Sequence, residues 1–344
     1  MSLAAGDAPD LRAEETIDAG AAVAARLLAN VETVVLGKTE VVRLVLAAFA
    51  AGGHVLLEDV PGTAKTVLAR ALAGSIEGGS AARIQCTPDL QPTDVTGLSI
   101  WSPQTREFEF RAGPIFANVV LVDEINRALP KAQSALLEGM AEFQVTVDGV
   151  SRRLPDPFLL IATENPIEHE GTFPLPAAQL DRFLLRTSLG YPTLDEEILI
   201  LEQQRQGHPL ARLRPVVGGD EIHRLRSAVE LVYVDPLLRR WGVELVRATR
   251  TLDFVELGAS VRASLALERA ARGWALVHGR SFVVPDDFSD LFGAVVDHRL
   301  MLSDELAVTD ELSPGDIARQ IWNACLARAP RPEPDWDDSG RAVP

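Results

Sequence analysis

The sequence has very little cysteine and no long hydrophobic run. Its 344 residues include only two cysteines, Cys86 and Cys325, which lie far apart without metal-type spacing. That scarcity excludes a disulfide framework and fits a reducing compartment, so we expect a cytoplasmic protein. The most apolar early run, residues 41–51, is interrupted by Arg43 and is shorter than the roughly 20 apolar residues of a membrane span. We therefore expect neither membrane insertion nor a targeting segment.

Basic residues are scarce relative to acidic ones. The 33 lysines and arginines stand against 49 aspartates and glutamates, which gives a formal net charge of −16. Such a surface repels nucleic acid and acidic membranes in bulk, although a local basic groove is compatible with it. Nucleic acid is therefore not an expected partner. Apolar residues make up 47% of the chain, which is enough to build the cores of two domains.

One stretch, residues 55–66, has the order of pieces that binds phosphate. An apolar run leads into a small, flexible turn, and Lys65 and Thr66 then open a helix. Backbone N–H groups of such a turn face an anion, the lysine reaches the outer phosphates, and the hydroxyl supplies an oxygen for Mg²⁺. The strict pattern has glycine where Asp59 and Ala64 stand, so this stretch alone is also compatible with an ordinary strand-to-helix connection. The expected nucleotide-binding residues are Asp59, Val60, Pro61, Gly62, Thr63, Ala64, Lys65, Thr66 and Val67.

A second stretch strengthens the nucleotide prediction. After Asn118, residues 119–122 form a continuous apolar run, typical of a parallel strand buried on both faces, and Asp123 and Glu124 follow it. Carboxylates there are costly unless they meet a cation or solvent at the carboxyl edge of the sheet, which is where ligands bind. Asp123 can hold Mg²⁺ together with Thr66, and Glu124 can polarise a water for attack on the γ-phosphate. The two stretches together predict a nucleoside triphosphatase.

Two further polar residues follow predicted strands or helices. Residues 158–162 should form another buried strand at the same edge, after which Asn165 would reach the attacking water or the γ-phosphate, or else belong to an Asn-Pro turn. Arg182 follows a short helix and precedes the last strand, 184–188. It is either half of a surface salt bridge with Asp181 or an arginine finger offered to a neighbouring subunit's nucleotide.

Two segments are expected to project from the core. Residues 87–116 form a long polar insertion, in which the alternation around Phe108 indicates a hairpin. An insertion of this size is either functional or a structural elaboration. Residues 145–151 alternate around Asp148-Gly149, which is a strong short-range hairpin signal. A hairpin there is a candidate moving part.

The domain organisation follows from changes in pattern. Residues 34–37 form an apolar turn before a helix at 38–51, and such a turn either covers a nucleotide base or is a plain connection. In the second half, helices are predicted at 197–206, 220–231, 236–249, 262–277, 285–299 and 314–327. The expected parts are a disordered N-terminus (1–14), an αβα nucleotide-binding core (15–190), a linker (191–216), an all-helical domain (217–329) and a disordered tail (330–344).

Taken together, these stretches resemble the MoxR group of AAA+ ATPases. The resemblance implies an α/β fold, namely an AAA+ module in which an αβα P-loop sandwich with a parallel sheet is followed by a smaller all-helical lid domain. The insertion at 101–106 and the hairpin at Asp148-Gly149 match the extra elements that group MoxR with the magnesium-chelatase and MCM-like clade. The resemblance covers residues 34–302 and rests on the strings at 58–66, 110–118, 122–128, 133–138, 179–183, 258–263 and 296–300.

The resemblance also implies a role for individual residues. Two departures from the usual pattern are small: Glu164 stands where glutamine is common and adds negative charge near the γ-phosphate, and Val261 stands where another residue often precedes the arginine. The implied roles are Walker A for Lys65 and Thr66, Walker B for Asp123 and Glu124, sensor 1 for Asn165, arginine finger for Arg182, and sensor 2 for Arg262.

The function implied by the resemblance is ATP hydrolysis, with ATP and Mg²⁺ bound at the subunit interfaces of a ring, hexameric as in similar proteins. Such proteins act as chaperone-like factors in the maturation of metalloenzymes or complexes, usually with von Willebrand factor A domain partners. Two alternatives stay open. An MCM-like or chelatase-like motor acting on nucleic acid is disfavoured by the net charge and by a hairpin whose basic residues are only Arg152 and Arg153. A nucleotide-binding scaffold without turnover is disfavoured by the intact set of catalytic residues.

Overall fold

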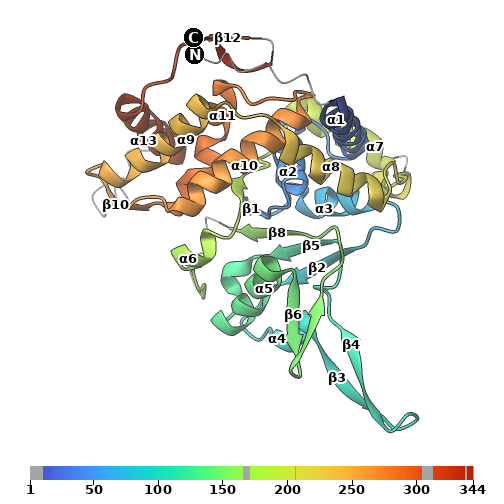
Figure 1. The fold of residues 1–344 in the computed structure, drawn as a ribbon. Helices are drawn as coiled ribbons and strands as arrows, with labels where there is room; N and C mark the ends of the chain where they lie inside the picture. Colours follow the sequence, from blue (N-terminus) through green and yellow to red (C-terminus); the bar gives the residue numbers. More distant parts are fainter. Residues whose placement is uncertain (1–10, 166–170, 206, 304–312, 338, 344) are drawn as a thin grey trace.

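A five-stranded parallel sheet lies at the centre of the first half of the chain (Figure 1). The computed structural model describes residues 11–165, 171–205, 207–303, 313–337 and 339–343. The internal strand β5 is buried along its whole length, as its apolar run predicts. In spatial order the strands are β2 (Ala81–Gln85), β5 (Val119–Asp123), β8 (Leu159–Glu164), β1 (Val55–Glu58) and β9 (Leu185–Thr187).

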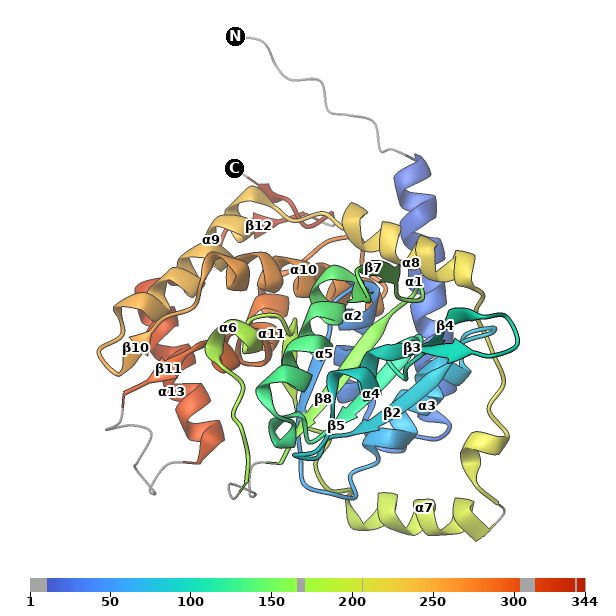
Figure 2. The same cartoon turned by 90° about the horizontal axis from the view of Figure 1, so that it is seen from below.

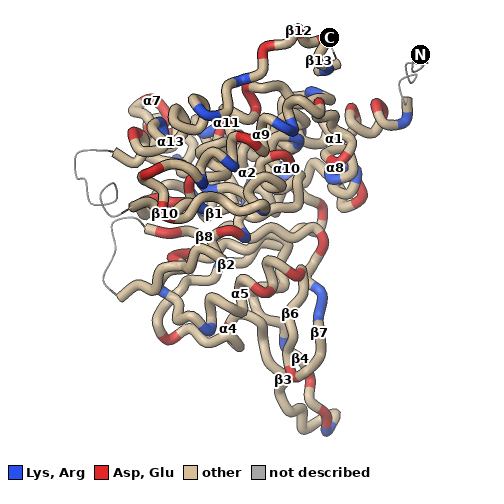
Figure 3. The backbone as a smooth tube through the Cα atoms, turned by 60° about the vertical axis from the view of Figure 1, so that its left-hand side comes forward, with Lys and Arg blue, Asp and Glu red and all other residues tan. Residues whose placement is uncertain are grey.

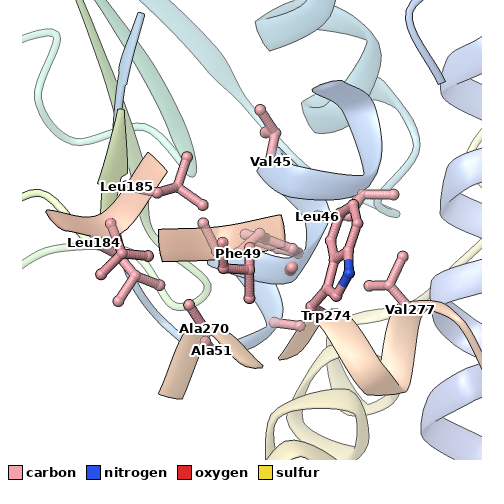
Figure 4. Close-up of a cluster of buried hydrophobic side chains, with 14 of the residues drawn as sticks. Val45, Leu46, Phe49, Ala51, Leu184, Leu185, Ala270, Trp274 and Val277 are labelled. Atoms are coloured by element: carbon pink, nitrogen blue, oxygen red, sulfur yellow. The ribbon is translucent and has the colours of Figure 1, made fainter. Parts of the chain in front are cut away.

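Alternate side chains of these strands enter two separate hydrophobic cores. Leu57 of β1 belongs to one core and its neighbour Leu56 to the other, because successive side chains of a strand point to opposite faces. The first core continues into the second half of the chain: Figure 4 shows Phe49 with Leu185 of β9 on one side and Trp274 on the other. The sheet and the helical half therefore share one continuous core.

Helices cover both faces of the sheet. Buried residues of α1, α2 and α3 belong to the first core, and those of α5 to the second; Figure 2 looks onto the face that α4 and α5 cover. These helices are α1 (Leu11–Glu32), α2 (Thr39–Ala50), α3 (Lys65–Gly74), α4 (Pro92–Thr96), α5 (Pro130–Glu142) and α6 (Ala177–Leu180), with a 3-10 turn η1 (Ile125–Arg127) after β5.

Both predicted hairpins are confirmed. The long insertion contains β3 (Gly97–Ser102) paired with β4 (Glu107–Ala112), and this ribbon extends away from the rest of the molecule (Figure 1). The second hairpin pairs β6 (Gln144–Val147) with β7 (Val150–Arg153). Its turn residues Asp148 and Gly149 have φ of 54° and 75°, the left-handed values that tight two-residue turns require.

The second half is helical, and the predicted helices are confirmed with boundaries that shift by a few residues. Besides the helices, this half contains a short antiparallel ribbon of β10 (Val255–Leu257) and β11 (Met301–Leu302). Within the described ranges, no helix has the length and apolar content needed to cross a membrane. The elements are α7 (Leu194–Arg205), η2 (Pro209–Ala211), α8 (Gly219–Leu231), α9 (Pro236–Ala248), η3 (Thr249–Thr251), α10 (Val261–Val277), α11 (Pro285–Val296), η4 (Asp297–Arg299) and α13 (Pro314–Arg328).

The N-terminal helix packs on the helical half as well as on the core. At Gly20 of α1 a side chain is excluded, because an added Cβ would lie 2.4 Å from the Cβ of Ala228 in α8. We had assigned α1 to the core. Its close packing on α8 shows that it also belongs to the second domain. Residues 11–14, expected to be disordered, are part of α1, and residues 1–10 lie outside the described residues.

The prediction of a disordered tail at 330–344 is wrong for its described part. β12 (Asp335–Trp336) pairs with β13 (Ala342–Val343), and the N–H of Ala342 donates to the Asp235 carboxylate at 3.0 Å. Within the turn, Asp337 accepts from the backbone N–H groups of Ser339 and Arg341, both at 2.9 Å. Side-chain acceptors thus order a segment that has no hydrophobic periodicity.

Candidate functional site

The loop between β1 and α3 uses small residues where the backbone turns sharply. Gly62 has φ +90°, and an added Cβ there would meet nothing within 4 Å, so its conformation and not its surroundings favours glycine. Ala64 has φ +65° and stands directly before α3. This is the small left-handed region that residues other than glycine enter only occasionally, which explains why the strict motif has glycine at this position.

Lys65 closes the loop on itself. Its Nζ donates to the backbone carbonyls of Asp59, at 3.0 Å, and Val60, at 2.9 Å. The loop borders a cavity of about 330 Å³, which we call the Lys65 cavity. It brings the loop, the acidic end of β5 and Asn165 together at one edge of the sheet, as predicted. Its lining residues are Asp59, Pro61, Gly62, Thr63, Ala64, Lys65, Thr66, Arg83, Gln85, Asp123, Glu124, Thr163 and Asn165.

The two carboxylates at the end of β5 have different surroundings. Asp123 is buried, and its carboxylate forms an ion pair with Arg83 and accepts from the Thr163 hydroxyl at 3.4 Å. Glu124 has φ +56°, which turns it out of the strand direction. Its carboxylate accepts from Gln85 at 3.1 Å and is paired with Arg127 at 3.1 Å. One acid is therefore anchored within the sheet while the other stands at its edge.

Sequence reasoning missed three residues of this cavity: Arg83, Gln85 and Thr163. Each lies at or near the carboxyl end of a strand next to β5, Arg83 and Gln85 on β2 and Thr163 on β8. The Thr163 hydroxyl bridges the pair, since it accepts from the backbone N–H of Glu124 at 2.9 Å and donates to Asp123. The polar residues on β2 and β8 are visible in the sequence. Only the order of the strands in the sheet shows that β2 and β8 flank β5 and so place these residues beside Asp123 and Glu124.

Asp59 ties the loop of the Lys65 cavity to the segment that follows β9. Its buried carboxylate accepts from the Ser188 hydroxyl at 2.9 Å and from the N–H groups of Leu189, at 2.6 Å, and Gly190, at 2.9 Å. Three donors on one carboxylate tie the loop to the segment that follows β9. Of its polar atoms, the backbone carbonyl is the one that meets Lys65, so the side chain that replaces a motif glycine is a tether between the first and last strands.

A smaller, mostly apolar cavity of about 100 Å³ adjoins the Lys65 cavity and shares Gly62, Thr63 and Ala64 with it. The turn at 34–37, for which base covering and plain connection were both open, contributes three residues and so lies at this cavity. Part of the remaining wall comes from 192–209, which we had assigned to a linker. The other lining residues are Val34, Val35, Leu36, Lys38, Val67, Gly190, Pro192, Ile200, Gln203, Gln204, His208 and Pro209.

Arg182 and Arg262 lie together, but elsewhere. Neither is among the described residues that line the Lys65 cavity; both border a cavity of about 410 Å³ between the core and the helical half, which we call the arginine cavity. The guanidinium of Arg262 lies 3.8 Å from the Asp181 carboxylate, and 70% of its side chain is exposed. Arg182 donates to the carbonyl of Leu137 at 3.0 Å.

Asp181 organises this second cavity. Its carboxylate forms a buried ion pair with Arg299 at 2.9 Å and accepts from the hydroxyl of Ser260 at 3.2 Å. Ser260 in turn accepts from the backbone N–H of Arg262 at 3.1 Å and so caps α10. The residue beside Arg182 is thereby bonded to two separate elements of the helical half.

Glu164 is not among the described residues that line the Lys65 cavity, although we expected its charge near the phosphates. It pairs in register with Glu58 on β1, and Glu58 is bonded to Arg186 at 3.1 Å. Burial, with the neighbouring charge of Glu58, raises the pKa of Glu164, and Arg186 opposes the shift.

Comparison with known proteins agrees with this geometry. A family model described as "ATPase family associated with various cellular activities (AAA)" matches residues 54–185, and one described as "AAA lid domain" matches residues 247–321. The chain is 49% identical over 295 residues to protein YeaC of Bacillus subtilis (86% of this chain, 92% of that protein). It is 41% identical over 305 residues to chaperone MoxR1 of Mycobacterium tuberculosis (86% and 80%). A crystal structure of a protein from Cytophaga hutchinsonii, 34% identical, superposes with a TM-score of 0.85 over 94% of this chain and 99% of that one.

Proposed function

Because this chain belongs to the MoxR family of AAA+ ATPases, we propose that it hydrolyses ATP at sites shared between copies of itself. One observation carries the proposal: Lys65, Asp123 and Glu124 line one cavity, whereas Arg182 and Arg262 line another. A single chain thus holds the phosphate-binding half of a site and, separately, a pair of exposed cations. Two copies placed head to tail would unite the halves.

The residues of the Lys65 cavity divide the work. The N–H groups of the loop and the N-terminal end of α3 face the phosphates, and Lys65 exchanges its two carbonyl partners for phosphate oxygens. Glu124 stands at the sheet edge, where it can accept a proton from the attacking water, and Asn165 orients that water.

The donor set fits Mg²⁺. This ion takes oxygen ligands and is usually held by one or two carboxylates together with substrate phosphates. Thr66 and Asp123 supply a hydroxyl and a carboxylate to the same cavity. Held by Thr66 and Asp123, Mg²⁺ would supply positive charge that offsets the charge developing on the phosphates.

The apolar cavity beside the loop suits a nucleotide base. Its walls are mainly aliphatic, and it opens toward Gly62, Thr63 and Ala64, which also border the Lys65 cavity. Gln203, Gln204 and His208 are among its polar side chains with which a base edge could hydrogen-bond. A base there and phosphates in the Lys65 cavity would place one nucleotide across both.

Arg182 and Arg262 serve the neighbouring copy. An arginine supplied from outside to the γ-phosphate is worth roughly 10³–10⁵ in rate. The exposure of Arg262, with only a 3.8 Å approach to Asp181, leaves its guanidinium accessible to a partner. A closed ring, hexameric as in related proteins, is the arrangement in which every copy both gives and receives these arginines.

At the cellular level we assign a chaperone-like role in remodelling or maturing protein complexes, metalloenzymes among them, with a von Willebrand factor A domain partner. Similarity to a protein named chaperone MoxR1 supports the role. The β3–β4 ribbon offers a contact surface, since Trp101 and Phe108 pair at 5.3 Å with half or more of each side chain exposed. A nucleic-acid motor is disfavoured because Arg152 stacks on Phe110, 3.8 Å from its centroid, and is not presented to phosphate.

Mixing two inactive variants tests the shared site. Arg182→Ala should bind ATP and lose at least roughly 10³-fold in turnover, and Lys65→Ala should fail to bind ATP. Their equimolar mixture should regain part of the wild-type phosphate release, because the intact loop of one copy meets the intact arginine of the other. A mixture that co-assembles by light scattering yet releases no phosphate would exclude a site shared in this way.

A further inference from the structure

The outward face of α7 is apolar and exposed. Leu194, Ile198 and Leu201 recur at the spacing of one helix face, with 76%, 47% and 62% of each residue exposed. No residue of α7, all of which is described, is buried. Its other face carries Ile200 and Gln203 toward the apolar cavity. We call the three outward residues the α7 stripe; contiguous apolar residues of this kind mark interaction surfaces, whereas single ones do not.

The α7 stripe has an acidic border. Of the charged residues of α7, Asp195, Glu196, Glu197 and Glu202 are acidic and only Arg205 is basic, and Figure 3 shows the acidic residues in red along this helix. A partner for the stripe should therefore present apolar side chains within a basic surround. Most of this chain cannot do so, because its net charge is −16.

One surface of the same chain has that chemistry. Val261 and Leu265 lie one turn apart on α10, and each is 67% exposed. Leu265 borders the arginine cavity together with Arg182, Arg262 and Arg269. A neighbouring cavity of about 510 Å³, also lined by Leu265 and Arg269, has Arg226 and Arg272 balanced by Glu230 and Glu268, so the basic surround comes from Arg182, Arg262 and Arg269. We call Val261 and Leu265 the α10 patch.

The stripe and the patch lie on different sides of the molecule. Figures 1 and 2 both place α7 well apart from α6. The patch lies near α6, because Ser260, at the start of α10, donates to Asp181, directly after α6. One chain therefore cannot pair them with each other. A contact between two unlike surfaces of the same chain is heterologous, and repeated around an axis it closes a ring.

We propose that the α7 stripe of one copy packs on the α10 patch of the next and forms the ring interface, an inference that rests on the proposed shared site. The stripe belongs to a helix that walls the apolar cavity, next to the Lys65 cavity of the same copy. The patch adjoins Arg262. The contact that brings Arg182 and Arg262 to a neighbour's phosphates therefore also brings α10 to that neighbour's α7.

Two exposed double variants test the interface. The stripe variant carries Ile198→Asp and Leu201→Asp, and the patch variant carries Val261→Asp and Leu265→Asp; all four side chains face solvent, so each variant should keep the wild-type thermal midpoint. With Mg²⁺ and ATP, wild type should assemble and each double variant should sediment as a monomer. Leu11→Asp, at a residue that is 68% exposed on α1, is the matched control and should assemble like wild type.

Mixing the two variants tests the direction of the contact. An equimolar mixture should form a 1:1 dimer and no larger species, because one intact stripe meets one intact patch. In that dimer the working loop belongs to the patch variant, so adding Lys65→Ala to the patch variant should abolish phosphate release, whereas adding it to the stripe variant should change nothing.

The readouts separate the interface from the activity. A 1:1 dimer without turnover would support the interface and remove the proposed ATPase site. Assembly of either double variant to the wild-type size, a mixture that stays monomeric, or a wild type that is monomeric with Mg²⁺ and ATP would overturn the interface. Abolition by Lys65→Ala in the stripe variant instead would show that the pairing runs the other way.

Discussion

The Lys65 cavity and the arginine cavity are each built around an aspartate, Asp123 and Asp181, but they use it differently. At the Lys65 cavity, Asp123 and its neighbours come from strand ends of a single sheet and bond to one another. At the arginine cavity, Asp181 bonds to the helical half while the guanidinium of Arg262 remains 70% exposed. The polar side chains of the first cavity bond to one another within one chain. The second cavity leaves the guanidinium of Arg262 exposed, where another molecule can contact it.

The largest effect on turnover should come from replacing Glu124, the proposed general base in the Lys65 cavity. Glu124→Gln keeps the hydrogen-bonding shape but cannot take a proton, so turnover should fall by roughly 10²–10⁴. ATP affinity should stay within a few-fold of wild type, because the loop and Lys65 are untouched. Steady-state phosphate release and ATP titration measure the two quantities. Equal turnover in variant and wild type would remove Glu124 from the mechanism.

The arginine cavity should be the more sensitive of the two to pH, because neutral histidines lie beneath it. Burial lowers the pKa of His54 to about 4; its Nε2–H donates to the carbonyl of Met140 at 2.8 Å, and its Nδ1 accepts from the backbone N–H of Leu160 at 3.0 Å. Burial likewise lowers the pKa of His298. An unfolded histidine binds its proton near pH 6.5, so stability should fall as the pH drops from 6.5 toward 4.

Asp297 has the opposite effect on the pH dependence of stability: it favours the folded state as the pH falls. Burial raises its pKa to about 6 from 3.8, so its ionisation opposes folding above pH 6 and this penalty disappears below pH 3.8. Asp297→Asn should raise the free energy of unfolding at pH 7.5 by up to about 3 kcal/mol and make the acid-induced loss steeper. Thermal midpoints at pH 7.5, 6 and 5 measure both slopes. A variant with the wild-type midpoint at every pH would show that Asp297 is not a destabilising carboxylate.

A smaller effect should follow from weakening the hydrogen bonds by which Asp59 fixes the loop of the Lys65 cavity. Asp59→Asn leaves at least one of three donors without an acceptor, which should cost about 1–3 kcal/mol of unfolding free energy. Because the same carboxylate fixes the loop, ATP affinity should also weaken, while assembly through the α10 patch should not change. Thermal unfolding and ATP titration check this, with the exposed Asp253→Asn as control. Unchanged affinity in a destabilised variant would make Asp59 purely structural.

How much could be predicted from the sequence differs between the two cavities as well. The apolar runs before Glu58 and Asp123 have the length and continuity of buried parallel strands, and strands that share a carboxyl edge bring their ends together. The meeting of Lys65 with the acidic pair could therefore be predicted from local pattern alone. Arg83 and Thr163 could not, because which strand lies beside β5 depends on the sheet order and not on any single strand.

The remainder depended on tertiary contacts that leave no periodic signal. The segment 192–209 lies within the expected linker at 191–216, in which a helix was predicted at 197–206. Because α7 buries no residue, no core-facing apolar pattern in its sequence places it beside the loop. That Arg262 would lie with Arg182 and away from Lys65 depends on how α10 is placed against α6, through Ser260 and Asp181. The tail was misjudged since its order comes from single side-chain acceptors, which composition does not reveal.

The position of Asp181 has a mechanical consequence. A single carboxylate bonds the turn before Arg182, the cap of α10 and the buried guanidinium of Arg299 on η4, so these three pieces form one lever. If the helical half rotates when ATP is hydrolysed, the bonds of Asp181 would transmit that movement to the turn that carries Arg182. In an assembly of the proposed kind, ATP hydrolysis in one copy would then shift the arginine that this copy offers to the next.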